Sequence, residues 1–357
     1  MKNLLEFLKS FSWKLLNWII RPKDILIKIG TLFFVTGFGG LTISSFSFEK
    51  KLSNGTTTKI QLTASENPEV INCLLWGIGI IGFLTLCYSI IDFVKQKRKI
   101  VVIGIEHIGL KKRIATPLSS FLKNATTIPI DLTVCYENDK VSNTQKALDL
   151  TKFGIEDNLK SKVAEMGNKE ITLVYGGMPP VALGFLAGYL MPNTYHVEVW
   201  DYDRTAKKEK NWYKLAGYRD SNKPQIDLSN YSPDKEICLL MAISHPVTIE
   251  QIRGKVSHPS YVKVTMPEVK YDSMSSIEKV TDFENEFGEL LKKLAADGVE
   301  KIHVFCAAQS SFNFCMGRQI TRNHPEIIIY EYDISHPDKY PWGVLLNTKD
   351  NISPCIV

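Results

Sequence analysis

Two turns of small residues are the positions at which this chain is best suited to bind a ligand. Each lies between a β-branched run and an apolar stretch of helical character: Gly176, Gly177, Met178 and Pro179 in one case, and Ala308, Gln309, Ser310 and Ser311 in the other. Free N–H groups and the dipole at a helix N-terminus attract anions. The turns therefore predict binding of a ligand with repeated phosphates, unless they are ordinary tight turns. A glutamate in place of Gly177 or Ser310 should then repel that ligand.

Polar and aromatic residues near the ends of the predicted strands are further candidates for ligand contacts. Two histidines each end a β-branched run, where they either touch the ligand or make ordinary hydrogen bonds: His107 and His245. Three tyrosines at or beyond the last strand of each half are suited to stacking on bases or to packing at the rim: Tyr202, Tyr332 and Tyr340. Arg318 is suited to pairing with phosphate or to a solvated position.

The elements that must position these residues occur twice. Residues 100–107, IVVIGIEH, align with residues 237–245, ICLLMAISH, and residues 171–203 align with 301–333. Each copy of the longer segment is a strand, a small turn, an apolar helix and a strand ending in WDYD or YEYD. Amphipathic stretches at 144–166 and 276–294 precede these segments. The order predicts a duplicated Rossmann-like α/β domain with halves 100–235 and 236–357, against the alternative of chance similarity between generic βα units.

Sequence patterns of catalysis are missing from residues 100–357, which contain no GxSxG, HExxH or Walker motif. Gly77, Gly79 and Gly82 spell GxGxxG, but they lie inside an apolar run without a preceding strand, so we predict close helix packing there instead of dinucleotide binding. The seven cysteines form no CxxC pair and are expected to be reduced. We expect no enzymatic activity, no metal and no cofactor.

The N-terminal hundred residues have the composition of a membrane anchor. Residues 25–46 carry one charge and residues 70–91 carry none, and each run has about 22 residues, enough to cross a hydrocarbon core of about 30 Å. We predict a transmembrane hairpin over 25–99, preceded by a basic amphipathic segment, 1–24, in the headgroup region. Basic residues flank the hairpin on its outer sides, which predicts that both termini are cytoplasmic.

Charge is divided unevenly along the chain. Residues 1–99 hold 13 of the 43 Lys and Arg and 6 of the 38 Asp and Glu, which leaves 30 basic and 32 acidic residues for the rest. Proteins that grip long DNA or RNA usually carry a positive surface excess. We therefore expect no long nucleic acid as a partner.

The predicted layout resembles a known family. The segment VFCAAQSSFNFCMGRQI at 304–320, followed by IIIYEYD and Tyr340, resembles the SAVED domain, the sensor module of bacterial CBASS antiphage systems, which is similar to two fused CARF units. The whole layout resembles the two-transmembrane SAVED effectors. Gln309 and Ser310 depart from the family, whose members often have a proline there.

The resemblance implies a membrane plus α/β fold class, in which a two-helix transmembrane hairpin precedes a SAVED domain of two CARF-like halves. It implies a bacterial inner-membrane effector with a cytoplasmic SAVED domain. That domain would bind a cyclic oligonucleotide, a trinucleotide in preference to a dinucleotide, and self-associate into a ring or filament that disrupts the lipid bilayer. Two alternatives stay open: a ring nuclease that cleaves the cyclic oligonucleotide, for instance with His245 and Ser310, and a receptor for an ordinary nucleotide.

Overall fold

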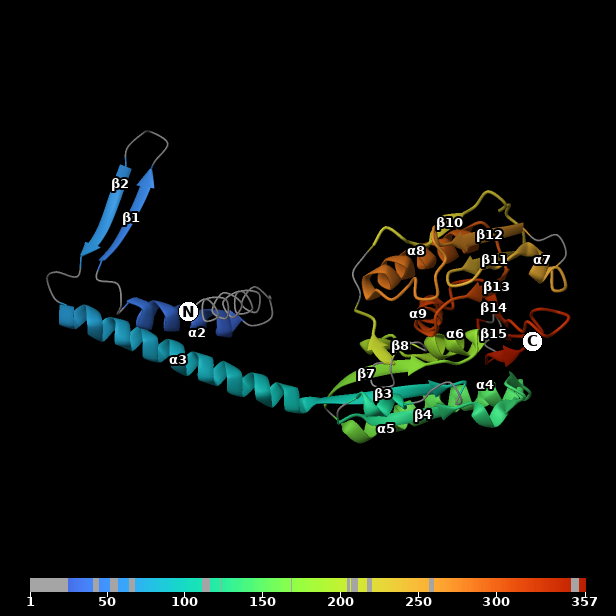
Figure 1. Cartoon of the computed structure of the whole chain (residues 1–357), viewed down its shortest axis with the longest axis horizontal. Coiled ribbons are helices and arrows are strands. Elements are labelled where there is room, and N and C mark those ends of the chain that lie inside the picture. The colour runs from blue at the N-terminus through green and yellow to red at the C-terminus, as the bar shows by residue number, and fades with distance from the viewer. Residues whose placement is uncertain are drawn as a thin grey trace. The chain divides into compact units, whose positions relative to one another are not determined.

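The chain divides into two compact units, Met1–Lys99 and Ile100–Val357, in the computed structural model (Figure 1). The structure describes residues 25–40, 45–51, 57–63, 68–110, 116–122, 124–167, 169–203, 206, 211–216, 220–256, 260–347 and 353–357. The predicted interfacial segment 1–24 lies outside these residues.

The described residues of the first unit form two helices and a β-hairpin. Its elements are α2 (Ile25–Gly40), β1 (Ser45–Lys51), β2 (Thr57–Thr63) and α3 (Pro68–Lys99), and β1 pairs antiparallel with β2. The predicted first span, 25–46, therefore includes the first two residues of β1, whereas the predicted second span, 70–91, lies inside α3. Among the described residues, neither helix is both long enough and apolar enough to cross a membrane.

Glycines bring α2 and α3 into close contact. A Cβ atom on Gly37 would lie 2.2 Å from the backbone nitrogen of Gly79, and one on Gly82 would lie 2.3 Å from that of Phe34. No side chain fits at such distances, so only glycine permits this approach of the two backbones. Two glycines of the GxGxxG pattern thus take part in helix packing, whereas Gly77 has nothing within 4 Å of a Cβ position.

The second unit contains two sheets with the same strand order. The first sheet runs β4–β3–β7–β8–β9, in which the first four strands are parallel and β9 is antiparallel. These strands are β3 (Ile100–Ile108), β4 (Thr126–Asp131), β7 (Glu170–Gly177), β8 (Val197–Tyr202) and β9 (Trp212–Lys214).

The second sheet repeats this order as β12–β11–β13–β14–β15 and adds one short strand at each edge, β10 and β16. Its strands are β10 (Gln225–Asp227), β11 (Glu236–Ala242), β12 (Ser260–Thr265), β13 (Lys301–Ala307), β14 (Glu326–Glu331), β15 (Trp342–Leu345) and β16 (Cys355–Ile356). β10 pairs with β12, so the second sheet begins before the boundary at residue 236 that the sequence predicts.

Helices cover and separate the two sheets. The predicted helix over 144–166 forms as α4 (Thr144–Lys152), a π-helical turn (Phe153–Asn158) and α5 (Leu159–Met166), and the one over 276–294 forms as α8 (Ile277–Ala296). Two short elements, the hairpin of β5 (Tyr136–Glu137) with β6 (Lys140–Val141) and the helix α7 (Ile249–Ile252), lie in connecting segments.

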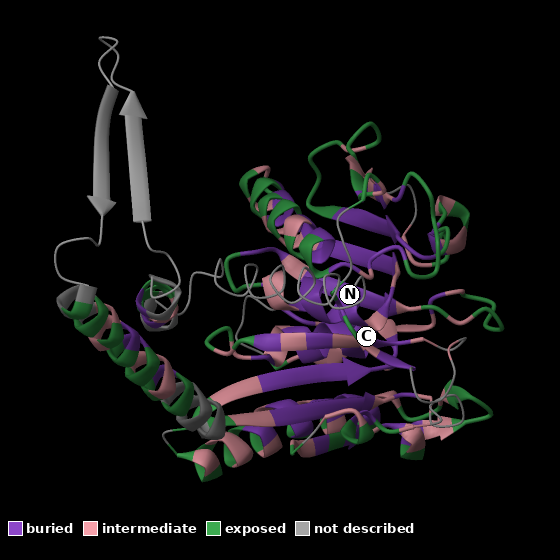
Figure 2. Ribbon diagram, turned by 60° about the vertical axis from the view of Figure 1, so that its left-hand side comes forward, coloured by how far each residue is buried: buried purple, intermediate pink, exposed green. Residues whose placement is uncertain are grey.

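Two helices, α6 (Val181–Leu190) and α9 (Ser310–Gln319), pack against each other between the halves. A Cβ atom on Gly188 would lie 2.0 Å from the carbonyl oxygen of Phe314, and one on Gly317 would lie 2.1 Å from that of Phe185. The two contacts are equivalent, because Gly188 and Phe185 occupy the places in α6 that Gly317 and Phe314 occupy in α9. Figure 2 shows that this central region is buried. The helix pair thus has the character of a two-fold interface within one chain.

Candidate functional site

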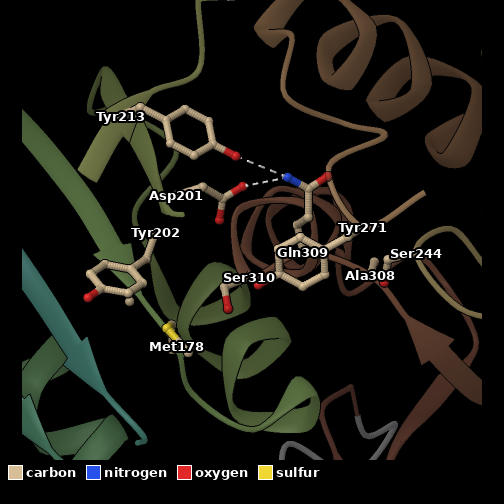
Figure 3. A pocket seen from close by; sticks show the side chains of 10 residues that line it. Met178, Asp201, Tyr202, Tyr213, Ser244, Tyr271, Ala308, Gln309 and Ser310 are labelled. Carbon is tan, nitrogen blue, oxygen red and sulfur yellow. Dashed lines mark hydrogen bonds between the residues drawn. The ribbon is translucent and has the colours of Figure 1, made fainter. Parts of the chain in front are cut away.

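A cleft of about 430 Å³, including the part that opens to solvent, lies where strands of both sheets end (Figure 3). β7, β8, β11 and β13 each contribute residues at or just after their carboxyl ends, which is where α/β folds commonly bind ligands. Its lining residues are Gly177, Met178, Asp201, Tyr202, Tyr213, Ser244, Tyr271, Ala308, Gln309 and Ser310.

Both predicted turns reach this cleft. Six of the residues named from the sequence line it: Gly177, Met178, Tyr202, Ala308, Gln309 and Ser310. Their neighbours Gly176, Pro179 and Ser311 are not among the lining residues, and Ser311 is fully buried. Gly177 has a steric role, because a Cβ atom there would lie 2.3 Å from the carbonyl oxygen of His107. A glutamate at this position would therefore disrupt the fold, so this substitution cannot test phosphate binding as the sequence suggests.

The carboxylate of Asp201, at the end of β8, crosses to the second half and caps α9. It accepts hydrogen bonds from the backbone N–H of Ser311 at 3.2 Å, from the Ser311 hydroxyl and from the Gln309 side-chain amide at 3.1 Å. Burial raises the pKa of Asp201, and these hydrogen bonds act in the opposite direction. A carboxylate of the chain itself thus occupies the helix N-terminus at which the sequence predicts a phosphate.

Glu331, at the end of β14, makes the reciprocal contact to the first half. Its carboxylate accepts a hydrogen bond from the backbone N–H of Ala182 at 3.3 Å, in the first turn of α6. Burial raises the pKa of Glu331 to about 7, against the lowering effect of the α6 backbone amides. Asp201 of WDYD and Glu331 of YEYD therefore each cap a helix of the other half, so at each predicted anion site a carboxylate of the chain itself already accepts from the helix N-terminus.

Gln309 joins three parts of the cleft. Its amide nitrogen donates to Asp201 and to the Tyr213 hydroxyl at 3.4 Å (Figure 3). Its amide oxygen accepts a hydrogen bond from the backbone N–H of Met274 at 2.7 Å. The last contact anchors the segment that carries Tyr271. Burial, and next the charge of Asp201, raise the pKa of Tyr213, which keeps this phenol protonated.

The two candidate histidines have different surroundings. His107 is fully buried, its Nδ1 lies 3.0 Å from the Tyr175 hydroxyl, and its Nε2 lies 3.2 Å from the Thr151 hydroxyl. Burial lowers the pKa of His107 to about 3, so the ring is neutral at physiological pH. His107 is thus a hydrogen-bonded core residue, the alternative that the sequence left open. His245 is exposed and follows Ser244, which lines the cleft.

The remaining predicted contacts lie outside the lining of the cleft. Arg318, near the end of α9, donates to the backbone carbonyl of Tyr195 at 3.3 Å. Tyr340 is buried and packs edge-on against Phe305, and the exposed Tyr332 packs edge-on against Tyr340. The structure therefore gives these three residues packing and anchoring contacts within the domain.

Four lining residues were not predicted from the sequence: Asp201, Tyr213, Ser244 and Tyr271. Asp201 could have been found from the sequence, because it is the first acidic residue of the repeated WDYD motif. Tyr271 lies in an irregular segment between β12 and α8, where no periodic pattern marks it.

The comparison with protein families decides what kind of domain holds this cleft. Residues 155–346, more than half of the chain, match the model of SAVED, the SMODS-associated and fused to various effectors sensor domain. This chain belongs to the SAVED family. Residues 5–148 match the model of the SAVED-fused 2TM effector domain. No curated protein matches the chain.

Solved structures of other SAVED proteins are similar to this chain, and the first of them shares its fold. The structure of the Acinetobacter baumannii Cap4 SAVED/CARF-domain containing receptor with the cyclic trinucleotide 2′3′3′-cAAA has a TM-score of 0.50 and 12% identity, and the match covers 78% of this chain. The corresponding structure with 3′3′3′-cAAA has a TM-score of 0.48 and 12% identity, and the match covers 76% of this chain and 58% of that one. The Moraxella osloensis Cap4 receptor has a TM-score of 0.43 and 11% identity, with 74% and 56% covered. The SAVED chain described here spans 60% or less of the length of these receptors.

Proposed function

We propose that this chain is a membrane-anchored effector whose SAVED domain binds a cyclic oligonucleotide, self-associates and then disrupts the membrane. The observation that carries the proposal is the cleft that both halves of a SAVED domain build at the carboxyl ends of their strands. A ligand in this cleft contacts both halves at once, so binding can change how the domain presents its surface to a second copy. In a CBASS system such a ligand is made by a partner cyclase during phage infection.

A cyclic trinucleotide is our preferred ligand. The support is that a receptor with the same fold was solved with 2′3′3′-cAAA. The acidic cap at each helix N-terminus argues against a simple phosphate-binding turn, so recognition must use other parts of the ligand as well.

Anchoring in a membrane is supported by the match of residues 5–148 to the 2TM effector domain. A second support is the apolar surface of the first unit. Large apolar side chains on α2 and α3 are exposed, and burying such surface in lipid stabilises it by roughly 25 cal/mol per Å². These side chains include Leu32, Val35, Ile81, Leu84 and Tyr88. The basic flanks support a topology in which both termini and the SAVED domain lie in the cytoplasm of a bacterial cell.

Self-association follows from the small size of the membrane unit. A single pair of helices has no interior that could hold water, so leakage needs several copies side by side. The ligand favours that assembly only if it binds the associated state more tightly than the free one. Head-to-tail contacts between SAVED domains, as rings or filaments, gather many hairpins in one patch of bilayer.

We further propose that the chain binds the ligand without cleaving it, because the sequence carries no catalytic motif. Incubating the purified chain with a cyclic oligonucleotide and recovering that ligand intact would support a receptor. Recovery of linear fragments would instead support the ring nuclease that the sequence leaves open.

Dye release from liposomes that contain the full chain tests the effector function. Leakage should appear only after a cyclic oligonucleotide is added, together with an increase in the mass of the assembly. A chain that starts at Ile100 should assemble without causing leakage. Equal leakage with and without every cyclic di- and trinucleotide tested, or linear nucleotides acting as well as cyclic ones, would contradict the proposal.

A further inference from the structure

The charge of the cleft is opposite to what a phosphate needs. Among its ten described lining residues there is no lysine and no arginine, and one residue, Asp201, is acidic. The others present tyrosine rings, hydroxyl groups, one amide, one thioether and backbone. A phosphodiester placed beside Asp201 would meet a carboxylate at short range, and none of these described lining residues offers a cation to offset the repulsion.

Asp201 already holds donors at the mouth of α9 that a phosphate would need. The N–H and hydroxyl of Ser311 and the amide of Gln309 all donate to Asp201. A phosphate would have to displace this buried carboxylate from three donors. This arrangement disfavours a phosphate beside Asp201.

The same lining suits a flat ring that carries hydrogen-bond donors. Tyr271 is 46% exposed and presents its ring at the cleft, where it can stack on a base. No described residue bonds the hydroxyl groups of Ser244 or Ser310, and a carboxylate such as that of Asp201 has more lone pairs than the three donors use. Carboxylates characteristically accept from the exocyclic amino group of a base.

We propose, building on the proposed function, that the cleft receives an amino-bearing nucleobase of the cyclic oligonucleotide, stacked on Tyr271, and holds its phosphates outside. Adenine and cytosine have an exocyclic amino group that can face Asp201, whereas hypoxanthine and uracil have a carbonyl oxygen at the corresponding ring position. A carbonyl oxygen would face the Asp201 carboxylate and be repelled.

The segment that carries Tyr271 is held in place before any ligand arrives. Lys279, which is almost fully buried, donates from Nζ to the carbonyl oxygen of Ser273 at 2.6 Å and to the Asp220 carboxylate at 2.8 Å. Together with the contact from Met274 to Gln309, these bonds fix the residues that directly follow Tyr271. A preformed stacking surface loses little conformational entropy on binding, so Tyr271 can contribute its full stacking energy.

Two substitutions at one position separate a base from a phosphate in the cleft. Ser310→Lys and Ser310→Met add side chains of similar bulk that differ in charge. If a base occupies the cleft, both should weaken binding of cyclic triadenylate to the full chain by a similar factor. If a phosphate occupies it, the lysine variant should bind more tightly than the methionine variant, by tenfold or more, and this result would overturn the inference.

Base preference and stacking are tested by calorimetry on the full chain in detergent. The probes are cyclic trinucleotides of equal ring size in amino-bearing and carbonyl-bearing pairs: adenine against hypoxanthine, and cytosine against uracil. We expect the amino-bearing member of each pair to bind at least tenfold more tightly. Tyr271→Leu should weaken binding by about 5- to 150-fold, the factor that corresponds to stacking on one base, and Tyr271→Phe should restore most of it.

The possible failures are distinct. Equal affinity within both pairs, or unchanged affinity in Tyr271→Leu, would overturn this inference and leave the proposed function intact. A wild-type chain that binds none of the cyclic trinucleotides would overturn both. A thermal melt of each variant shows whether a loss of affinity reflects a loss of fold.

Discussion

Replacing Glu331 by glutamine removes a charge from the interface between the two halves while keeping the oxygen that accepts the Ala182 N–H. The carboxyl group has a pKa of about 7 in the folded chain, raised from 4.5 chiefly by burial. Between these two values the folded state holds a proton that the unfolded state has released. The free energy of unfolding therefore falls as the pH rises from about 4.5 to 7, and it is constant with respect to this group above pH 7.

The size of the effect follows from the two pKa values. Each pH unit in that interval changes the free energy of unfolding by about 1.4 kcal/mol, which gives about 3 kcal/mol in all. Because the Glu331 side chain is partly exposed, solvent screening reduces this to roughly 2 kcal/mol. Glutamine stays neutral, so Glu331→Gln should be about 2 kcal/mol more stable than the wild type at pH 8 and within about 1 kcal/mol of it at pH 5.

Urea unfolding followed by tryptophan fluorescence at pH 5, 6, 7 and 8 measures this difference. Glu326→Gln, the same substitution at the start of β14, is the matched control. A difference between Glu331→Gln and the wild type that does not grow with pH would refute the reasoning. So would a glutamine variant that is less stable at pH 8, because the contact to α6 would then require the charge.

Three further predictions concern the helix pair, the Tyr271 segment and the membrane topology. Gly188→Ala and Gly317→Ala should each lower the free energy of unfolding by about 3 kcal/mol or more, and by similar amounts, because each new methyl group meets a backbone carbonyl at about 2 Å. The control, Gly288→Ala in α8, has room for the methyl group and should raise the free energy of unfolding by up to about 1 kcal/mol. Urea unfolding measures all three variants. Lys279→Met should leave Asp220 and the Ser273 carbonyl without their donor and speed hydrogen exchange in residues 270–276, whereas unchanged exchange would show that Gln309 alone holds the segment. A reporter fused after Val357 should be active only in the cytoplasm and one inserted at Asn54 only in the periplasm, and the opposite pattern would contradict the proposed topology.

Equal spacing made the duplicated architecture visible in the sequence. Tyr175 to Asp203 and Phe305 to Asp333 span the same number of residues, and these segments form β7–α6–β8 and β13–α9–β14. The strand, turn and helix order is local, so hydrophobic periodicity is enough to find it. The two turns could be placed near a binding site for the same reason, because parallel strands end at one edge of a sheet.

Contacts between the halves could not be predicted in the same way. Asp201 caps a helix 110 residues further along the chain, and no local pattern records that pairing. The sequence predicts free helix N-termini, whereas in the structure one backbone N–H of each helix donates to an acidic residue from the other half. His107 illustrates a second limit, since only the packing of Tyr175 and Thr151 around it shows that the ring faces the core.

The exchanged caps at Asp201 and Glu331 bear on how such a chain arises and changes. An isolated half would carry an uncapped helix and an acidic residue with no helix to cap, whereas two identical halves would satisfy each other across a symmetry axis. This is the arrangement of a homodimer joined into a single polypeptide. Once joined, the copies are free to diverge, and Gln309 now precedes α9 where Pro180 precedes α6. Proline has no side-chain amide, so only the second copy can make the hydrogen bond from Met274 to Gln309 that anchors the segment with Tyr271. Joining the two copies in one chain thus permits a binding cleft whose two halves differ, which a symmetric homodimer cannot provide.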